Sequence, residues 1–443
     1  MTFYIDTLGC KVNQYETQAM AALLEKRGHA LAAEPRLAEA RIINTCAVTG
    51  ESGRKSRQAV RRAKRESPNA FIAVCGCFSQ VSPDEVKALG ADLIGGSGKR
   101  EEFVRRLEEL FSQRETVVDV DDPAGRRYFE LLPSGSLSGR TRAMLKKQDG
   151  CCNFCSYCII PYARGPVRSM PLEDVAEQSA QIARSGYKEI VLTGIEISSY
   201  GRDLEGDVSL IDAIRAVSGA APGLRIRLGS LEPRTATEEF CRAAADVPML
   251  CPHFHMSLQS GCDRTLRRMN RKYDSGEYYE YISNLRKHFP GCAVTTDVIV
   301  GFPGETEEDF EQSLAFLKKC AFAAVHVFPY SPHPGTPAAK MPEQIDKGEK
   351  HRRAAAAGEL VRTLSRDYAE GFVLTDMPVL FEQEKDGFSY GHTPNYLTVK
   401  VCGTGLHNVV KRVHITGIGD GELCGIIQPG QFDISGDESY NIL

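Results

Sequence analysis

The first part of the chain alternates short apolar runs with longer amphipathic runs. Residues 3–5, 40–44 and 70–74 are mainly apolar segments of a length typical of buried strands. Residues 13–26 and 53–66, which lie between or beside them, have the composition and length of helices. Because strands that alternate with helices form parallel sheets, this pattern predicts an α/β domain with a parallel sheet.

The same rhythm resumes in the middle of the chain, from about residue 141 to 370. The strand candidates, separated by charged helical segments, are residues 189–193, 224–229, 253–258, 293–300 and 324–329. Repeated βα units predict a barrel or partial barrel with its chemistry at the carboxyl ends of the strands. Residues 347–370 have the pattern of a long amphipathic helix that closes this domain.

The pattern changes again near residue 374. Residues 379–382, 396–401 and 410–415 are short alternating segments separated by Gly and Asn, which predicts a small antiparallel β barrel. Turn signals between about 112 and 140 indicate a linker. We therefore expect an amino-terminal domain over residues 1–120, a linker over 121–140, a barrel domain over 141–372 and a terminal domain over 373–443.

Composition narrows the class of protein. A chain of 443 residues with 42% hydrophobic and 25% charged residues has enough core for about three globular domains. We see no apolar run long enough to span a membrane and no signal peptide. Fifteen cysteines without an export signal favour a reducing cytoplasm over a disulfide framework. The net charge of −4 means that any affinity for RNA must come from local basic patches.

Three cysteines, Cys151, Cys155 and Cys158, have C-x3-C-x2-C spacing. Three thiolates this close together can each bind one iron of a four-iron cluster, which leaves the fourth iron open for chemistry. The alternative is a zinc knuckle or a group of buried thiols. Zinc needs a fourth ligand nearby, and the next histidine is His253.

A second set of cysteines follows the three strands expected in the first domain. Cys10, Cys46 and Cys77 each come just after one of these strands. Because parallel strands place their carboxyl ends at one edge, the three thiols can hold a second cluster there. The alternative is that they are unrelated buried cysteines. We interpret Cys75 as a packed strand residue, and the scattered cysteines as inert core thiols: Cys241, Cys251, Cys262, Cys292, Cys320, Cys402 and Cys424.

Several motifs in order resemble the radical S-adenosylmethionine (radical-SAM) methylthiotransferase family over the whole chain. In order along the chain, these motifs are Gly9-Cys10-Lys11-Val12-Asn13-Gln14-Tyr15-Glu16, Asn44-Thr45-Cys46-Ala47-Val48-Thr49, Gly76-Cys77, the Cys151 motif running into Ile159-Ile160-Pro161-Tyr162-Ala163-Arg164-Gly165, Ser257-Leu258-Gln259-Ser260-Gly261, and Gly301-Phe302-Pro303-Gly304-Glu305-Thr306. The opening motif, Arg227-Leu228-Gly229-Ser230-Leu231-Glu232-Pro233 and Phe328-Pro329-Tyr330-Ser331-Pro332 are most similar to the branch that modifies N6-threonylcarbamoyladenosine in tRNA. Cys152 departs from the family, whose members more often carry a polar non-cysteine residue there.

The resemblance implies two 4Fe-4S clusters and S-adenosyl-L-methionine as cofactors. The Cys151, Cys155 and Cys158 cluster would bind S-adenosylmethionine and cleave it to a 5′-deoxyadenosyl radical, which would abstract hydrogen from C2 of the adenine. The Cys10, Cys46 and Cys77 cluster would present a methylated sulfur for insertion at C2. The implied product is 2-methylthio-N6-threonylcarbamoyladenosine at position 37 of tRNA.

Further residues are expected to hold the cofactor, most of them because they follow strands of the central domain, and Tyr157 because an aromatic residue before the last cysteine fits the radical-SAM signature. They are Tyr157, Gly194, Glu196, Ser230, Glu232, Gln259, Gly301, Pro303 and Gly304. The glycines at 301 and 304 permit close approach of the backbone to an adenosyl group. Glu196 either accepts from the methionyl amine or caps the next segment. Glu232 either reaches the ribose or pairs with Arg234.

The expected RNA contacts are basic. Seven cations lie on one predicted helix: Arg54, Lys55, Arg57, Arg61, Arg62, Lys64 and Arg65. Three more lie on the terminal barrel, which resembles a TRAM domain: Lys400, Lys411 and Arg412. The helix is either a phosphate-binding surface or a solvated face. The aromatic residues of the barrel, Phe381, Phe388, Tyr390 and Tyr396, either stack on unpaired bases or pack in its core.

Three functions are therefore separable. The first is a cytoplasmic tRNA methylthiotransferase that binds the anticodon stem-loop and takes electrons from a flavodoxin-type or ferredoxin-type donor. The second keeps the chemistry but acts on isopentenyladenosine or on a ribosomal protein. The third is a non-catalytic iron-sulfur protein that binds RNA. Cleavage of S-adenosylmethionine distinguishes the third from the others.

Overall fold

The amino-terminal part of the molecule is a six-stranded parallel sheet in the order β2-β1-β3-β4-β5-β6. The structure is a computed structural model that describes residues 1–113, 115–133 and 141–429. The strands are β1 (Thr2–Thr7), β2 (Ala30–Leu31), β3 (Ala40–Thr45), β4 (Phe71–Gly76), β5 (Leu93–Gly95) and β6 (Val117–Asp119). The helices are α1 (Lys11–Lys26), α2 (Gly50–Glu66), α3 (Cys77–Val81), α4 (Pro83–Ala88) and α5 (Arg100–Phe111).

Helices cover both faces of this sheet, which explains the continuous apolar runs in its central strands. Ile43 and Val74 pack against α2 on one face. Ile42 and Ala73 pack against α1 and α5 on the other. Every residue of β3 and β4 is consequently buried, and the predicted parallel α/β arrangement is confirmed.

The central part forms an open barrel of two parallel sheets around one continuous core. The strands are β7 (Arg142–Lys146), β10 (Glu189–Thr193) and β11 (Arg225–Leu228) in one sheet, and β12 (Ser230–Leu231), β13 (His253–Met256), β14 (Ala293–Val300) and β15 (Ala324–Pro329) in the other. A short hairpin of β8 (Gln148–Asp149) and β9 (Arg168–Ser169) lies beside them. The helices are α6 (Ile160–Arg164), α7 (Leu172–Arg184), α8 (Leu210–Ala220), α9 (Glu238–Ala245), α10 (Asp263–Arg268), α11 (Ser275–His288), α12 (Glu307–Cys320) and α13 (Lys347–Glu370).

Two of these barrel strands, β7 and β12, are absent from the sequence prediction. In β7, Ala143 and Leu145 enter the core, whereas Arg142 and Lys146 form ion pairs on the other face. The prediction relied on continuous apolar runs, and it missed this strand because charged residues occupy both of its ends. Residues 117–119, in the stretch with turn signals, pair with β5 as the edge strand β6. Residues 134–140 of the expected linker lie outside the described residues.

The carboxyl-terminal part is a closed five-stranded barrel in the order β16-β17-β18-β20-β19. Its strands are β16 (Asp376–Lys385), β17 (Phe388–His392), β18 (Thr398–Cys402), β19 (Val410–Gly419) and β20 (Glu422–Ile427). The sequence predicted the barrel but not β17 and β20, each of which contains a glycine. Gly391 is required because a Cβ there would collide with the carbonyl oxygen of Leu380 on the facing strand.

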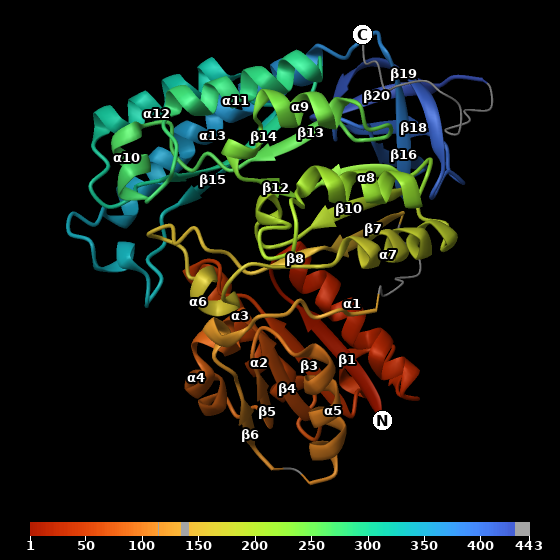
Figure 1. Ribbon diagram of the computed structural model, residues 1–443, viewed down its shortest axis with the longest axis vertical. Coiled ribbons are helices and arrows are strands. Elements are labelled where there is room, and N and C mark those ends of the chain that lie inside the picture. Colours follow the sequence, from red (N-terminus) through yellow and green to blue (C-terminus); the bar gives the residue numbers. More distant parts are fainter. Residues whose placement is uncertain (114, 134–140, 430–443) are drawn as a thin grey trace.

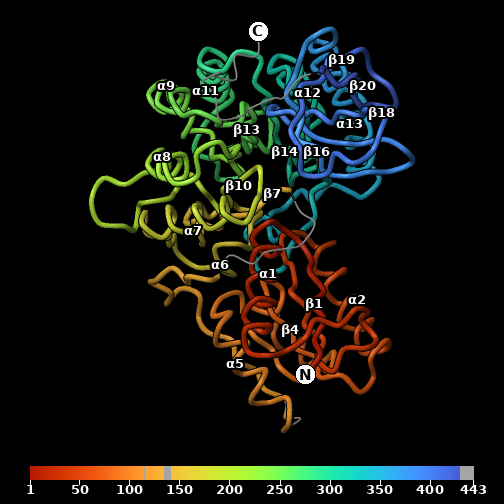
Figure 2. Tube along the Cα trace, turned by 90° about the vertical axis from the view of Figure 1, so that its right-hand side faces the viewer, coloured from red at the N-terminus to blue at the C-terminus, as the bar shows by residue number. Residues whose placement is uncertain are grey.

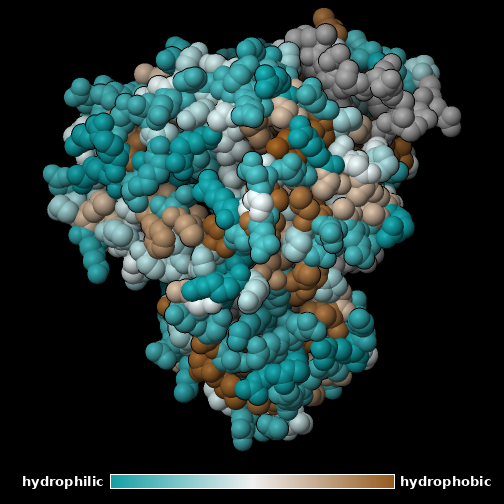
Figure 3. Space-filling model, viewed as in Figure 1, coloured by the Kyte–Doolittle hydropathy of each residue, from teal (hydrophilic) through white to brown (hydrophobic). Residues whose placement is uncertain are grey.

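Figures 1 and 2 place the amino-terminal sheet at one end of the molecule and the central and terminal barrels at the other. Helix α1 packs against β7, so it connects the two ends. The face in Figure 3 is mainly hydrophilic, with hydrophobic residues in scattered groups. No helix in the described part of the chain is long and apolar enough to cross a membrane.

Candidate active site

The first cysteine set lies at the carboxyl edge of the amino-terminal sheet. Cys10 precedes α1, Cys46 follows β3, and Cys77 begins α3 directly after β4. Since β1, β3 and β4 are neighbours, the strands bring the three thiols together. Burial, together with the charges of Cys77 and Cys10, raises the pKa of Cys46 to about 11. Gly9 has a positive φ of 93°, and a Cβ there would lie 2.6 Å from the Cys46 sulfur.

The second set, Cys151, Cys155 and Cys158, occupies the loop between β8 and α6. A turn in which the amide of Cys158 donates to the carbonyl of Cys155 at 2.9 Å brings these two residues together. Burial, together with nearby thiolates, raises the pKa of both Cys151 and Cys158 to about 12. Cys152, the residue that departs from the family, is exposed.

The two sets face each other across the junction of the first two domains. Helix α3, which begins at Cys77, packs against α6, which follows Cys158 in the other domain. Arg164 on α6 reaches across and donates from Nε to the Cys77 sulfur at 3.2 Å. Arg271 donates from Nη1 to the Cys155 sulfur at 3.3 Å. Cationic donors beside thiolates suit a negatively charged iron-sulfur cluster.

Both cysteine sets therefore fit four-iron clusters in number, placement and surroundings. All six cysteines are free thiols. Among the described residues, no group of three or more His, Cys, Asp or Glu side chains is arranged around a single metal ion. In a four-iron cluster each thiolate binds a different iron, so its three ligands do not converge on one ion.

A buried ionic network continues from Arg164 along the same junction. Glu16 of α1 accepts from Arg164, from Arg100 at 2.9 Å and from Lys146 at 2.8 Å. Lys146 also contacts Asp149 at 2.7 Å. Burial alone would raise the pKa of Glu16, but the positive charges of Arg164, Lys146 and Arg100 outweigh it and lower this pKa. The network is ionised and joins α1 to β7 and β8, the two strands that precede Cys151.

The other cysteines mostly pack as expected. Cys75 lies in the sheet core with Phe71 and Ala73. Cys241, Cys251, Cys262, Cys292 and Cys320 are buried. The prediction that Cys402 is a core thiol is wrong, because Cys402 is exposed at the end of β18. Cys424 is only partly buried.

The residues expected to hold S-adenosylmethionine lie after the carboxyl ends of the central strands. Gly194 and Glu196 follow β10, Gln259 follows β13, and Gly301 follows β14. Gln259 has a φ of 73°, a left-handed conformation that is uncommon for a residue other than glycine. Tyr157, which lies in the cysteine loop itself, packs with Met269, Phe302 and Tyr330.

The two glutamates with open assignments have protein partners. Glu196 caps a short helix by accepting from the amide of Ser198 at 3.0 Å. Glu232 accepts from Arg234 Nε at 3.0 Å. In this arrangement, capping accounts for Glu196 and ion pairing accounts for Glu232. Ser230 is exposed at the start of β12, and Pro303 accepts a hydrogen bond from Arg268.

The basic helix α2 has fewer free charges than its sequence suggests. Four of its seven cations have partners: Arg54 pairs with Glu51, Arg57 with Glu85, Arg62 with Asp6, and Lys64 with the carbonyl of Gly90. Lys55, Arg61 and Arg65 have no such partner among the described residues. They line a cavity of about 530 Å³ on this side of the molecule.

The terminal barrel divides its aromatic residues between core and surface. Phe381 is fully buried in the barrel core, which removes it from the candidates for base stacking. Tyr396 is 37% exposed. Lys400 lies 4.1 Å from the ring centroid of Phe388, and Arg412 is exposed on β19 beside Lys411.

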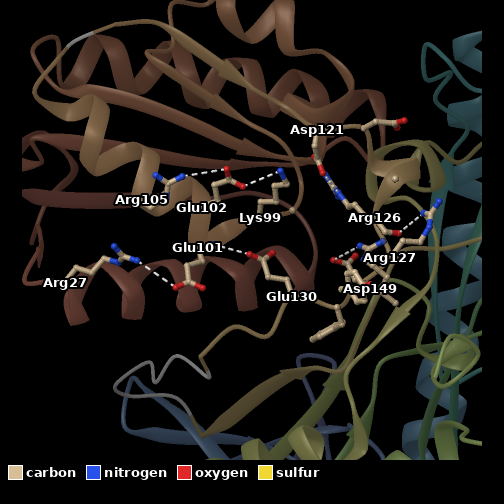
Figure 4. Close-up of a pocket in the computed structure, with 16 residues that line it drawn as sticks. Arg27, Lys99, Glu101, Glu102, Arg105, Asp121, Arg126, Arg127, Glu130 and Asp149 are labelled. Carbon is tan, nitrogen blue, oxygen red and sulfur yellow. Dashed lines mark hydrogen bonds and ion pairs between the residues drawn. The ribbon is translucent and has the colours of Figure 1, made fainter. Parts of the chain in front are cut away.

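Two larger cavities lie beside the cysteine junction. The cavity in Figure 4, of about 870 Å³, is lined by charged residues that largely pair with one another, such as Arg126 with Asp121. It reaches Asp149, but no cysteine lines it. A second cavity, of about 660 Å³, is lined by Cys151, Cys152, Phe154 and Tyr162 on the outer side of the cysteine loop.

Arg164 and Arg271 are the principal residues that the sequence left without a role. Arg164 stands in the motif that follows the second cysteine set, which was the available signal. Arg271 has no comparable signal, because it comes from a turn after α10, 113 residues after Cys158 by sequence number.

Comparison with known proteins finds two matching family models. The model described as the radical SAM superfamily matches residues 145–317, and one described as uncharacterized protein family UPF0004 matches residues 2–96. Among solved structures, the radical S-adenosylmethionine methyltransferase TsrM from Kitasatospora setae is similar with a TM-score of 0.57 and 14% identity. That match covers 76% of this chain and 74% of TsrM, and it supports the fold.

Curated relatives match nearly the whole chain. The threonylcarbamoyladenosine tRNA methylthiotransferase MtaB of Bacillus subtilis (strain 168) is 40% identical over 91% of both chains. MtaB of Thermotoga maritima is 38% identical over 86% of both chains. The tRNA-2-methylthio-N(6)-dimethylallyladenosine synthase of Pelotomaculum thermopropionicum is 34% identical over 96% of this chain and 97% of its own. The chain therefore belongs to the radical-SAM family of tRNA methylthiotransferases.

Proposed function

We propose that this enzyme methylthiolates C2 of N6-threonylcarbamoyladenosine at position 37 of tRNA. The observation that carries the chemistry is the pair of three-cysteine sets that face each other across one junction. The 40% and 38% identical relatives bear the name of this activity. A dimethylallyladenosine substrate is the second candidate, because a relative with that name matches 96% of the chain at 34% identity.

In this proposal Cys151, Cys155 and Cys158 bind the cluster that works with S-adenosylmethionine, and Cys10, Cys46 and Cys77 bind the second cluster. When bound, these cofactors supply a 5′-deoxyadenosyl radical and a sulfur atom for the adenine. The chain's own part is to hold the two sets face to face. Arg164 of the central domain donates to Cys77 of the amino-terminal set, and Arg271 donates to Cys155 of the second set.

The cofactor and partner assignments complete the proposal. S-adenosylmethionine lies against the strand ends that carry Gly194, Gln259 and Gly301. An electron donor of flavodoxin or ferredoxin type approaches from the cavity beside Cys151 and Cys152, where Phe154 and Tyr162 are exposed. The tRNA anticodon stem-loop contacts α2 and the terminal barrel. The enzyme acts in the cytoplasm, and its domains follow the boundaries at residues 120, 140 and 372.

The test is mass spectrometry of tRNA nucleosides from a strain that lacks the gene. We expect loss of 2-methylthio-N6-threonylcarbamoyladenosine and accumulation of N6-threonylcarbamoyladenosine. Loss of the methylthio group from dimethylallyladenosine instead would select the second candidate. An unchanged nucleoside profile, combined with no cleavage of S-adenosylmethionine by the reconstituted protein, would contradict both.

The unpaired cations of α2 should matter for tRNA binding. A triple substitution of Lys55, Arg61 and Arg65 by Ala removes three charges that have no carboxylate partner. It should weaken tRNA binding and reduce the slope of log affinity against log salt by roughly 2 to 3, because each phosphate contact releases counterions.

The matched control for this experiment is a triple substitution of Arg54, Arg57 and Arg62, whose charges are already paired with carboxylates. Filter binding at several salt concentrations compares the two variants. If both variants change the salt slope equally, α2 does not distinguish its paired from its unpaired cations, and the assignment fails.

A further inference from the structure

A charged cluster lies on the inner side of the central barrel, near the starts of its first strands. Arg227 of β11 binds Glu189 of β10 through Nε at 2.6 Å and Nη2 at 2.9 Å. Arg142 of β7 contacts Glu382 of the terminal barrel at 2.5 Å. Each of these two arginines therefore has a carboxylate that balances its charge.

Lys11 adds a cation to this cluster without a partner. It is the first residue of α1, next to Cys10, and its residue is exposed to solvent. It forms no hydrogen bond or ion pair within the described part of the chain. The ammonium group of Lys11 interacts electrostatically with Arg227, Arg142 and Glu189. The cluster consequently has a surplus of positive charge at Lys11.

His253 of β13 provides a second, independent sign of a missing ligand. Its residue is only 9% exposed, and its Nδ1 atom has no hydrogen-bond partner. A buried polar atom of this kind normally has one. Burial and the charges of Arg227 and Lys11 hold the pKa of His253 well below its usual value, so the ring is neutral.

The terminal barrel contributes an aromatic ring to the same place. The ring of Tyr396 lies 4.9 Å from that of His253 and 4.6 Å from that of His392. Its hydroxyl accepts a hydrogen bond from Arg142 at 2.8 Å, and Arg227 lies 4.6 Å from its centroid. Three parts of the chain thus meet around Lys11, His253 and Tyr396, which we call the Lys11 site.

We propose that the Lys11 site binds the carboxylate of the threonylcarbamoyl group, with Lys11 as the residue that determines specificity. This inference rests on the proposed function. An unmodified or dimethylallylated adenosine carries no charge on N6, whereas the threonylcarbamoyl group carries a carboxylate. Since Lys11 adjoins Cys10, an adenine whose C2 approaches that cysteine set lies within reach of the Lys11 side chain. His253 supplies a neutral donor, and Tyr396 a ring surface.

The experiment measures binding of three anticodon stem-loops that differ only at position 37. One carries N6-threonylcarbamoyladenosine, one carries its methyl ester, and one carries unmodified adenosine. We expect wild-type protein to bind the first about tenfold to a hundredfold more tightly than the other two, as for a hydrogen bond to a charged group. Lys11→Gln should abolish this preference, whereas Lys26→Gln, on the exposed last turn of the same helix, should retain it.

The outcomes separate this inference from the proposed function. If wild-type protein binds all three stem-loops equally, substrate choice by the carboxylate is wrong, and the proposed substrate is in doubt. If wild-type protein discriminates and Lys11→Gln protein of equal iron content still does so, the Lys11 site is wrong but the substrate stands. If Lys11→Gln weakens all three equally, Lys11 contacts a backbone phosphate instead.

Discussion

Cys155→Ala protein should form no 5′-deoxyadenosine from S-adenosylmethionine, whereas Cys46→Ala protein should continue to form it. Cys155 belongs to the set in the central domain, and its loss removes a ligand from the radical-generating cluster. Cys46 belongs to the set in the amino-terminal sheet, so its loss should remove only the methylthio product. Chromatography of the nucleosides after reduction with dithionite measures both outcomes.

The matched control is Cys152→Ala, which removes an exposed thiol beside Cys151 and should leave both products unchanged. Wild-type protein should contain about eight irons, whereas Cys155→Ala and Cys46→Ala, which each lose one cluster, should contain about half of that. Methylthiolated tRNA from folded Cys46→Ala protein would contradict the assignment of that set. Loss of 5′-deoxyadenosine in the same variant would show that the two domains do not act independently.

The convergence of the cysteines could be predicted because it follows from topology. Cys10, Cys46 and Cys77 each follow a strand, and parallel neighbouring strands end at one edge. The residue before Cys10 is a glycine, which can adopt the positive φ found there and leaves room for the Cys46 side chain. Such features need only the order of elements along the chain.

Contacts between segments that are distant in the sequence could not be predicted, because they depend on how those segments pack within and between domains. Arg62 pairs with Asp6, and Arg57 with Glu85, so the sequence overestimated the free charge of α2. The contact of Arg164 with Cys77 joins residues 87 positions apart. Charged barrel residues such as Arg142 hid the strand that carries them, since their partners lie in another domain.

Arg164→Ala should have the largest effect on stability among single substitutions in the ionic network. Arg164 is fully buried and contacts Glu16, Asn13 and Cys77. Its removal leaves the Glu16 carboxylate with fewer positive partners in a dry environment. Breaking a buried ion pair in this way costs about 3–5 kcal/mol. Thermal unfolding of the apoprotein, monitored by circular dichroism, should show a clear decrease in Tm.

Two further variants make this prediction specific. Arg352→Ala breaks ion pairs with Glu307 and Glu349 that are largely exposed, and exposed pairs contribute at most about 1 kcal/mol. Arg164→Lys keeps the charge but lacks the planar group that reaches sulfur, carboxylate and amide together. The Arg164→Lys variant should therefore recover part of the stability lost in Arg164→Ala. The cluster bound at Cys77 should have a lower reduction potential than in wild-type protein, because the hydrogen bond that stabilises its negative charge is lost. Equal Tm values for Arg164→Ala and Arg352→Ala would show that the network does not hold the junction together, and an unchanged potential in Arg164→Lys would show that the contact with Cys77 does not tune the cluster.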